Sequence, residues 1–268
     1  MLDYLKELVK EICVEKNIDY KILSKDWIMK LERDNKISYI VGSRFSINSV
    51  TAASIASDKY ATYDVLKNAN LPIIDHKMIF NPKFRKGCVS DFNSKKEIKY
   101  YINSCKNKKI VLKANDGSCG RDVYLCKSVR EVNKNMKKIF SRKASASICP
   151  FYEIDTEYRV ICLDGECKLI YGKKNSDENW KHNLSQGASV IEVDDESLKA
   201  KLKEIALKAT NEIGLRFASV DIIRLVTGEL LIIEVNSGVT INKYTEFVSN
   251  GREIAKKIYG EAIEKMLV

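Results

Sequence analysis

The chain has few of the residues that build histidine- or cysteine-based sites. Its two histidines, His76 and His182, argue against a histidine-bound zinc ion and against histidine as a general base. Its eight cysteines show no Cys-x-x-Cys spacing, and several lie in apolar, strand-like runs. We therefore expect reduced, mostly buried thiols, which are typical of a cytoplasmic protein.

Membrane-spanning and secretory patterns are also missing from the sequence. No apolar run approaches the roughly 20 residues that cross a bilayer. The first 16 residues are amphipathic and mixed in charge, unlike the basic-then-apolar order of a signal peptide. We therefore expect a cytoplasmic location and no membrane partner.

What the chain does contain is a globular composition with an excess of positive charge. With 268 residues, of which 45% are hydrophobic and 31% charged, it can form one large domain or two to three small ones. Its net charge of +10 favours anionic partners such as nucleotides, acidic peptides or nucleic acid. Many of the lysines, as in 95–109, recur at the spacing of a solvated helix face. Because no aromatic–basic recognition motif accompanies them, we expect no nucleic acid partner.

Hydrophobic periodicity predicts a mixed α and β chain. Helices are predicted over residues 2–16, 58–70, 95–107, 128–140, 197–213 and 251–266. Strands are predicted over residues 37–41, 73–80, 110–113, 123–126, 145–152, 157–162, 167–171, 220–223 and 230–233. Residues 19–36 fit neither pattern. The predicted N-caps are Asp58, Ser94 and Ser128, the last in a capping box with Glu131.

A hairpin with an acidic face is predicted over residues 217–238. Two apolar runs flank Thr227-Gly228, where glycine accepts the positive φ of a tight turn. Glu234 and Asn236 are two residues apart and share one sheet face, and hairpin pairing can bring Asp221 beside them. Three hard oxygen ligands on one face suit Mg²⁺. The alternative is that these are solvated acids at strand ends.

A small-residue loop lies between the predicted strands at 110–113 and 123–126. In the loop Asn115–Arg121, Gly117 and Gly120 let the backbone approach closely and turn its N–H groups toward an anion. Lys113 ends the entering strand, where a phosphate site needs a cation. The alternatives are an ordinary hairpin turn and a surface lysine.

Taken in order, these segments resemble the ATP-grasp superfamily. The likeness is to its carboxylate–amine ligases, which include RimK-type glutamate ligases, glutathione synthetases, cyanophycin synthetases and D-alanine–D-alanine ligases. It covers about residues 56–244. It implies an α/β (α+β) fold in which two α+β subdomains grip ATP, after a short N-terminal α/β region. The implied division is 1–56 for that region, 57–155 for the lid subdomain and 156–268 for the C-terminal core with its metal site.

The resemblance also implies how the nucleotide is held. DKYATYDVLKNANLPI looks like the family's Asp-Lys helix start, so that Lys59 contacts the phosphates. VLKANDGSCGRDV looks like the family's lysine and lid loop, with Lys113 near the α-phosphate. The implied lid residues that cover the β- and γ-phosphates are Gly117, Ser118, Cys119 and Gly120. CPFYEIDTEYRV is similar to the hinge strand, where main-chain groups near Phe151 and Glu153 contact adenine and Glu157 binds the ribose.

Further residues are implied to lie near the reacting atoms. Lys173 matches a basic residue that faces the transferred phosphoryl group. WKHNLSQG is similar to a RimK-type segment, which brings Lys181 and Asn183 to the reaction centre. VDIIR and IIEVNSG match the metal triad, and the ligands implied are Asp221, Glu234 and Asn236. The implied cofactors are ATP and Mg²⁺, with Mn²⁺ as a substitute.

The chain departs from the family pattern at several positions. Ser219 lies two residues before Asp221, where some members carry an arginine, and Arg159 or Lys181 is the expected replacement. Ser-Gly-Val-Thr follows Asn236 in place of the frequent small-residue–Pro–Gly, which predicts a different acceptor-side loop. Pro150 occupies a hinge position that is often Glu or Gln, which leaves adenine recognition to the main chain. The short N-terminal region weakens any inference about the substrate.

The function implied is an ATP- and Mg²⁺-dependent carboxylate–amine ligase that forms an acyl phosphate and releases ADP and phosphate. Bringing two anions together requires positive charge rather than a base, which agrees with the scarcity of histidine. The expected partners are small-molecule or peptide carboxylates and amines, and the basic surface favours an acidic peptide or amino acid. The alternative is a non-catalytic ATP-binding scaffold or regulatory protein. The oligomeric state stays open, with a homo-oligomer among the options.

Overall fold

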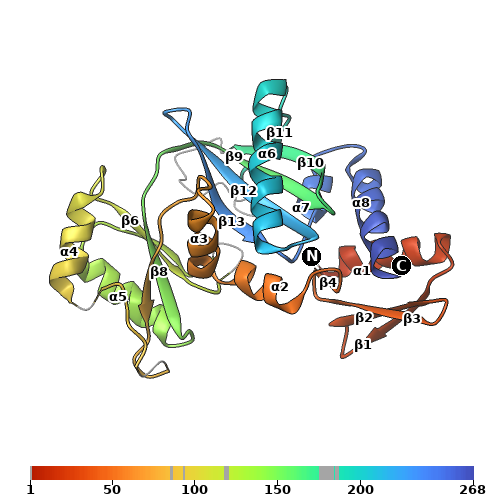
Figure 1. The fold of residues 1–268 in the computed structure, drawn as a ribbon, viewed down its shortest axis with the longest axis horizontal. Coiled ribbons are helices and arrows are strands. Elements are labelled where there is room, and N and C mark those ends of the chain that lie inside the picture. Colours follow the sequence, from red (N-terminus) through yellow and green to blue (C-terminus); the bar gives the residue numbers. More distant parts are fainter. Residues whose placement is uncertain (1, 85–86, 93, 118–120, 175–183, 185–186) are drawn as a thin grey trace.

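The computed structural model describes residues 2–84, 87–92, 94–117, 121–174, 184 and 187–268. Three sheets form the framework, and helices pack on them (Figure 1). Their strands lie in residues 19–45, 77–150 and 154–236. The mixed α/β class predicted from periodicity is confirmed. No helix of the described ranges is both long and apolar enough to cross a membrane.

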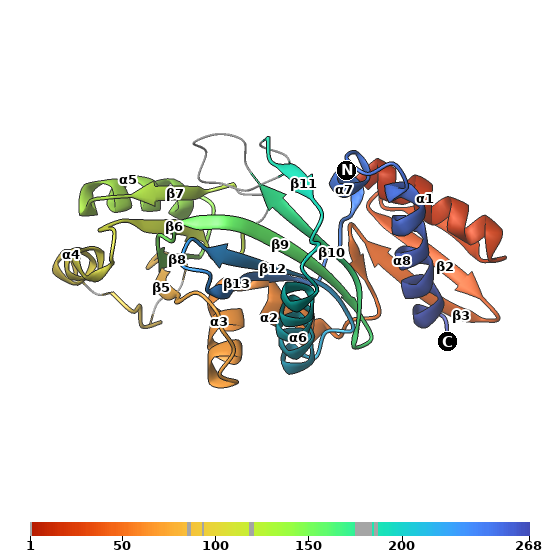
Figure 2. The same ribbon diagram turned by 90° about the horizontal axis from the view of Figure 1, so that it is seen from above.

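The N-terminal sheet packs with both ends of the chain. It is antiparallel in the order β1-β2-β3-β4, and residues 19–36, which fitted no pattern, form its first hairpin. Its elements are α1 (Leu2–Glu15), β1 (Asp19–Leu23), β2 (Ile28–Arg33), β3 (Lys36–Val41) and β4 (Arg44–Phe45). The last helix, α8 (Gly251–Met266), lies beside α1, and Leu8, Ile40 and Tyr259 share one core (Figure 2).

The lid sheet is antiparallel in the order β5-β8-β6-β7. Its elements are β5 (Lys77–Phe80), α4 (Lys95–Ser104), β6 (Ile110–Ala114), β7 (Val123–Cys126), α5 (Val129–Phe140) and β8 (Ser145–Pro150). Helices α4 and α5 bury Ile98, Ile102, Val132 and Ile139 against one face of this sheet. The predicted caps Ser94 and Ser128 accept from the N–H groups of Glu97 and Glu131.

The central sheet has the order β11-β10-β9-β12-β13. Its elements are β9 (Ile154–Leu163), β10 (Glu166–Lys174), β11 (Ser189–Ile191), β12 (Phe217–Leu225) and β13 (Leu230–Asn236). The predicted hairpins at Asp164-Gly165 and Thr227-Gly228 both form. Three helices cover one face of this sheet in Figure 2: α2 (Val50–Ser57), α3 (Lys59–Asn68) and α6 (Glu196–Ile213).

Alternation along the central strands sends polar residues to the uncovered face. On β9, Tyr158 and Val160 pack under the helices, so Glu157 and Arg159 point the other way. On β12, Val220 packs under the helices and Asp221 points the other way. The charged side chains of these two strands thus share the face opposite the three helices.

Several predictions of local structure need correction. The strand expected at 73–80 begins only at Lys77, because the carbonyl of Pro72 and the N–H of Ile74 bond instead to Ile232 of β13. In the capping box, the Glu131 carboxylate accepts from the N–H of Lys127 at 2.6 Å, one residue before the cap. Helix α2, β11 and the short helix α7 (Asn242–Thr245) were not predicted.

Asn48 joins the N-terminal sheet to the central hairpin. Its Nδ2 donates to the carbonyl of Phe217 at 2.6 Å, and its Oδ1 accepts from the N–H groups of Arg216 and Phe217, both at 2.9 Å. One side chain therefore satisfies three main-chain groups where β12 begins.

We expect Asn48→Ala to lower the free energy of unfolding by about 1–3 kcal/mol, because it leaves these main-chain groups without their partner. Urea unfolding followed by circular dichroism measures the change. The matched control, Asn103→Ala on the exposed side of α4, should change the free energy by less than about 0.5 kcal/mol. Equal stability of the two variants would contradict this role.

Candidate active site

One cavity of about 640 Å³ lies between the lid sheet and the central sheet. The N-terminal region contributes Ser43, the lid sheet contributes Lys113 and Arg121, and the central sheet contributes the charged face described above. The predicted site residues that line it are Lys59, Lys113, Gly117, Phe151, Glu157, Arg159, Lys173, Asp221, Glu234 and Asn236. The fold thus brings together residues that are more than 170 positions apart in the sequence.

The buried carboxylate of Asp221 is the centre of the charged face. Arg159 donates to both of its oxygens, from Nε at 2.8 Å and from a terminal nitrogen at 2.7 Å. Lys173 Nζ donates to one oxygen at 3.0 Å, and Asn236 Nδ2 donates to the other at 3.2 Å. Lys173 also donates to Glu157. The two cations and two anions of this network neutralise each other.

Strand register explains why these side chains meet. Asp221 pairs with Arg159 of β9 on one side and with Glu234 of β13 on the other. Glu157 pairs with Lys173 of β10. A bulge after Asp221 shifts the register of the β12–β13 pair, as bulges beside functional sites often do.

Asp221 and Lys173 stay ionised despite their burial. Burial alone would raise the pKa of Asp221, but the charges of Arg159 and Lys173 outweigh it and hold that pKa below its ordinary value. Burial and the neighbouring Arg159 would lower the pKa of Lys173, yet Asp221 and Glu157 raise it overall. These groups are therefore charged at neutral pH and hold one another in place.

Lys59 contacts both the loop after β6 and the β12–β13 hairpin, which carries the predicted metal ligands. It is the first residue of α3, where Asp58 accepts from the N–H of Ala61 as the predicted N-cap. Its ammonium donates to the carbonyl of Gly117 at 2.6 Å and lies 3.0 Å from a Glu234 oxygen. The start of α3, the lid loop and β13 thus meet at one lysine.

Lys113 is a buried cation on the wall of the cavity. It is 8% exposed, and no residue in the described part of the chain pairs with it or accepts its hydrogen bonds. Its strand neighbours Leu112 and Ala114 pack under α4 and α5, so Lys113 points into the cavity. Among the cavity-lining cations of the described residues, Lys113 and Arg121 alone lack an acidic partner, which gives the lid side two uncompensated charges.

One end of the cavity is apolar. Side chains of both sheets line it, and they include Ile74, Val111, Ile223 and Ile233. This is the end nearest the predicted adenine-binding hinge.

Two main-chain groups of the predicted hinge already form hydrogen bonds within the chain. The N–H of Phe151 donates to Lys109, and the carbonyl of Glu153 accepts from Val226. Phe151 lines the cavity, whereas the Glu153 side chain is exposed and accepts from Asn107 at 3.3 Å. The predicted adenine contacts are therefore left to the other main-chain groups of residues 151–153, which do not form these two bonds.

The donor set fits a hard divalent cation. Glu234 carries a carboxylate on the cavity wall. Asn236 uses its amide nitrogen toward Asp221, which leaves its oxygen as an acceptor. Both oxygens of Asp221 already accept from cations or from Asn236, so Asp221 would have to release a partner to become a direct ligand. Within the described ranges no three His, Cys, Asp or Glu side chains cluster as a metal site, so the amide of Asn236 is needed.

The predicted residues and the residues that line the cavity do not coincide fully. Ser118, Cys119, Gly120, Lys181 and Asn183 lie outside the described residues. Polar lining residues that were not predicted include Ser43, Arg121, Thr240, Asn242 and Lys243.

Ser43 reaches the cavity through a contact that no motif announces. Arg44 forms a bridge with Gly238, and a Cβ on Gly238 would lie 2.7 Å from the Ser43 hydroxyl. The glycine of the Ser-Gly-Val-Thr segment is therefore required by the N-terminal turn packed on it. Arg121, by contrast, ends the small-residue loop and could have been found there.

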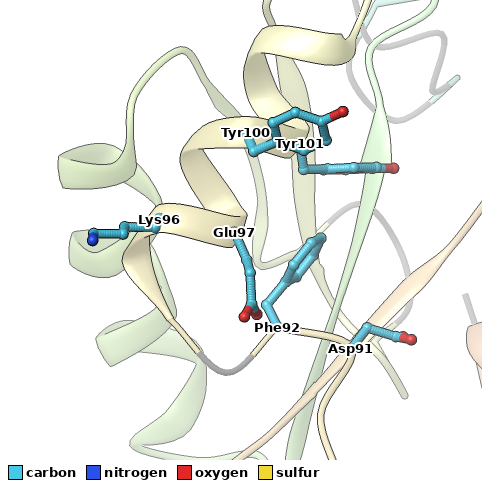
Figure 3. Close-up of a pocket in the computed structure, with 6 residues that line it drawn as sticks. All are labelled: Asp91, Phe92, Lys96, Glu97, Tyr100 and Tyr101. Carbon is cyan, nitrogen blue, oxygen red and sulfur yellow. The ribbon is translucent and has the colours of Figure 1, made fainter.

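A second hollow, of about 390 Å³, lies beside α4 (Figure 3). Phe92, Tyr100 and Tyr101 line it, with Asp91, Lys96 and Glu97. It contains a single lysine beside two acids, so its charge does not suit a polyphosphate. The large cavity is the candidate active site.

Comparisons with solved structures agree with this fold. The chain matches a D-alanine–D-alanine ligase from Bacillus anthracis with a TM-score of 0.60 at 17% identity, over 82% of this chain and 68% of that one. It matches the ATP-grasp ligase PsnB, bound to a precursor variant, Mg and ADP, with a TM-score of 0.58 at 14% identity, over 82% and 61%. At these identities the likeness shows the fold alone.

Sequence comparisons are more specific. A tetrahydromethanopterin:alpha-L-glutamate ligase from Methanocaldococcus jannaschii is 26% identical over 87% of this chain and 86% of its own length. The glutamate–LysW ligase ArgX from Sulfolobus acidocaldarius is 28% identical over 71% of this chain and 64% of its own. A family model described as the RimK-like ATP-grasp domain matches residues 56–261. The chain belongs to the RimK-like ATP-grasp family of ATP-dependent carboxylate–amine ligases, as its motifs indicated.

Proposed function

We propose that this chain joins the carboxylate of one substrate to the amine of another through an acyl phosphate, with ATP and Mg²⁺. One observation carries this proposal: Lys113 is a buried cation with no counter-ion among the described residues, and it faces the hairpin that holds Glu234 and Asn236. A buried charge without a partner is costly, so it indicates a site built for an anion.

The charges of the cavity suit a triphosphate with one divalent cation. The paired groups cancel, which leaves Lys113 and Arg121 uncompensated on the lid side. Mg²⁺ adds two positive charges, and a nucleoside triphosphate carries about four negative ones. The apolar end with Ile223 and Ile233 has room for a base. The cavity thus offers the positive charge, the apolar surface and the metal ligands that the parts of ATP need.

The proposed reaction has two steps. A carboxylate oxygen forms a bond to the γ-phosphorus, and the bond from that phosphorus to the bridging oxygen of ADP breaks. The amine nitrogen then bonds to the acyl carbon, phosphate leaves with the acyl C–O electron pair, and the amine gives up a proton to solvent or phosphate. The products are an amide, ADP and phosphate.

The residues of the chain act mainly by position and charge. Lys113 and Arg121 would offset the charge that collects on the transferred group, and Lys59 would hold the lid loop over it. Arg159 and Lys173 keep Asp221 ionised, and Asp221 orients Asn236. Glu234 and Asn236 would hold Mg²⁺, which when bound screens the phosphates and aligns the transfer.

The second substrate would enter at the end of the cavity opposite the apolar wall. Ser43, Thr240, Asn242 and Lys243 line that end. The relatives named above are glutamate ligases, which supports glutamate or an acidic peptide as one substrate. The net charge of +10 agrees with an acidic substrate.

We expect Glu234→Gln to reduce ATP-dependent product formation by at least about 100-fold, because a neutral amide oxygen binds a divalent cation much more weakly than the charged carboxylate does. ADP release and mass spectrometry of products from amino acids and peptides measure this. Glu229→Gln, on the exposed turn of the same hairpin, is the matched control and should retain activity. Equal activity of both variants at limiting Mg²⁺ would show that Glu234 binds no metal.

We expect Lys113→Met to weaken ATP binding by more than about tenfold while leaving the free protein as stable as before, or more stable. Methionine fills the space of the lysine stem and removes a buried charge that lacks a counter-ion. Titration calorimetry and thermal unfolding without ligand measure the two effects. Lys106→Met, an exposed control, should change neither. Loss of stability with unchanged ATP affinity would make Lys113 a structural residue.

A further inference from the structure

The positive charge of the chain is concentrated in one stretch. Residues 77–150, which form the lid sheet with α4 and α5, contain 19 lysines and arginines against five aspartates and glutamates, a net charge of +14. The other 194 residues contain 27 against 31, a net charge of −4. The excess of positive charge therefore belongs to residues 77–150 alone.

The nucleotide site uses little of this charge. Among the described residues of 77–150, only Lys113 and Arg121 of these cations line the cavity. Helices α4 and α5 pack on Leu112 and Ala114, on the face of the lid sheet that points away from the cavity. The remaining cations need another explanation.

Helix α5 orders four of them along one side. Arg130, Lys134, Lys137 and Lys138 follow the i, i+4, i+7, i+8 spacing of a single helical face and are all exposed. We call this set the α5 basic stripe. Val132, on another side of the helix, is fully buried against the sheet.

No acid among the described residues neutralises the α5 basic stripe. None of its four cations pairs with an acid in the part of the chain that the structure describes. The one acid on α5, Glu131, accepts from the main chain of Lys127. Helix α4, which shares the core of α5, adds exposed Lys95 and Lys99. Like charges at this spacing repel, so the surface favours a bound polyanion.

We infer that the α5 basic stripe docks an acidic segment of a polypeptide substrate, at a distance from the reaction. The inference rests on the proposed function for its choice of a polypeptide, since a ligase of carboxylates and amines can act on one. The stripe carries no exposed aromatic ring on which bases could stack, and Lys138 lies over the ring of Tyr124 at 5.4 Å. An acidic peptide therefore fits it better than a nucleic acid.

The hollow beside α4 limits where the segment runs. Asp91 and Glu97, two of the five acids of residues 77–150, line that hollow (Figure 3). An acidic chain would be repelled there, so it should follow α5. The stripe would hold the substrate and raise its local concentration, while Lys113 and the metal ligands act on its reacting end.

The test is binding of a fluorescent peptide of ten glutamates to the full chain without ATP, by anisotropy at low salt. The variant Lys134→Glu/Lys137→Glu/Lys138→Glu should bind at least about tenfold more weakly than the unaltered chain. The matched control, Lys201→Glu/Lys203→Glu/Lys257→Glu, makes the same change in net charge on exposed positions of α6 and α8. It should change affinity by less than about threefold. The neutral variant Lys134→Gln/Lys137→Gln/Lys138→Gln should weaken binding to an intermediate degree.

Three outcomes would overturn the inference. The first is an equal loss of affinity in the α5 variant and its control, which would mean net charge alone. The second is peptide binding that does not weaken between about 0.05 and 0.5 M salt, since surface charge is screened over this range. The third is a single-stranded oligonucleotide of equal charge that binds tenfold tighter than the peptide through the same lysines. Because binding is measured without ATP, a chain that binds the peptide but forms no ADP would contradict the proposed function and leave the stripe supported.

Discussion

The structure depends on one buried carboxylate shared by two cations. Asp221 accepts from Arg159, Lys173 and Asn236, and Lys173 also donates to Glu157. The network is neutral as a whole, so it can be buried and rigid. Because it cancels its own charge, the charge left for a ligand comes from the lid, through Lys113 and Arg121. Rigid ligands on the central sheet and free cations on the lid sheet are the two halves of one anion site.

Two side chains hold the three sheets of the molecule together around the cavity. Lys59 links the lid loop at Gly117 to Glu234, and Asn48 links the N-terminal sheet to the start of β12. The short N-terminal region contributes Ser43 to the cavity and is held to the last helix by a shared core. This region lies outside residues 56–261, which match the family model, whereas the other residues that line the cavity lie within them.

Local chemistry in the sequence was enough to predict much of the site. Period-two spacing placed Glu234 and Asn236 on one face, and the turn at Thr227-Gly228 brought Asp221 beside them. The caps at Asp58 and Ser94 followed from their residue types. What could not be predicted depends on pairing between distant strands. The bond between Arg159 and Asp221 needs the β9–β12 register across 62 residues, and Ser43 needs the isolated bridge between its neighbour Arg44 and Gly238. Short elements such as β11 and α7 carry too few residues for a periodic signal.

The most direct test of the shared anion site is the position of a bound metal. Crystals grown with Mn²⁺ and a non-hydrolysable ATP analogue would show the ion by its anomalous scattering. The ion should lie about 2 Å from oxygens of Glu234 and Asn236, with the triphosphate between it and Lys113. An ion or triphosphate bound elsewhere, with Lys113 still lacking an anion, would contradict the account.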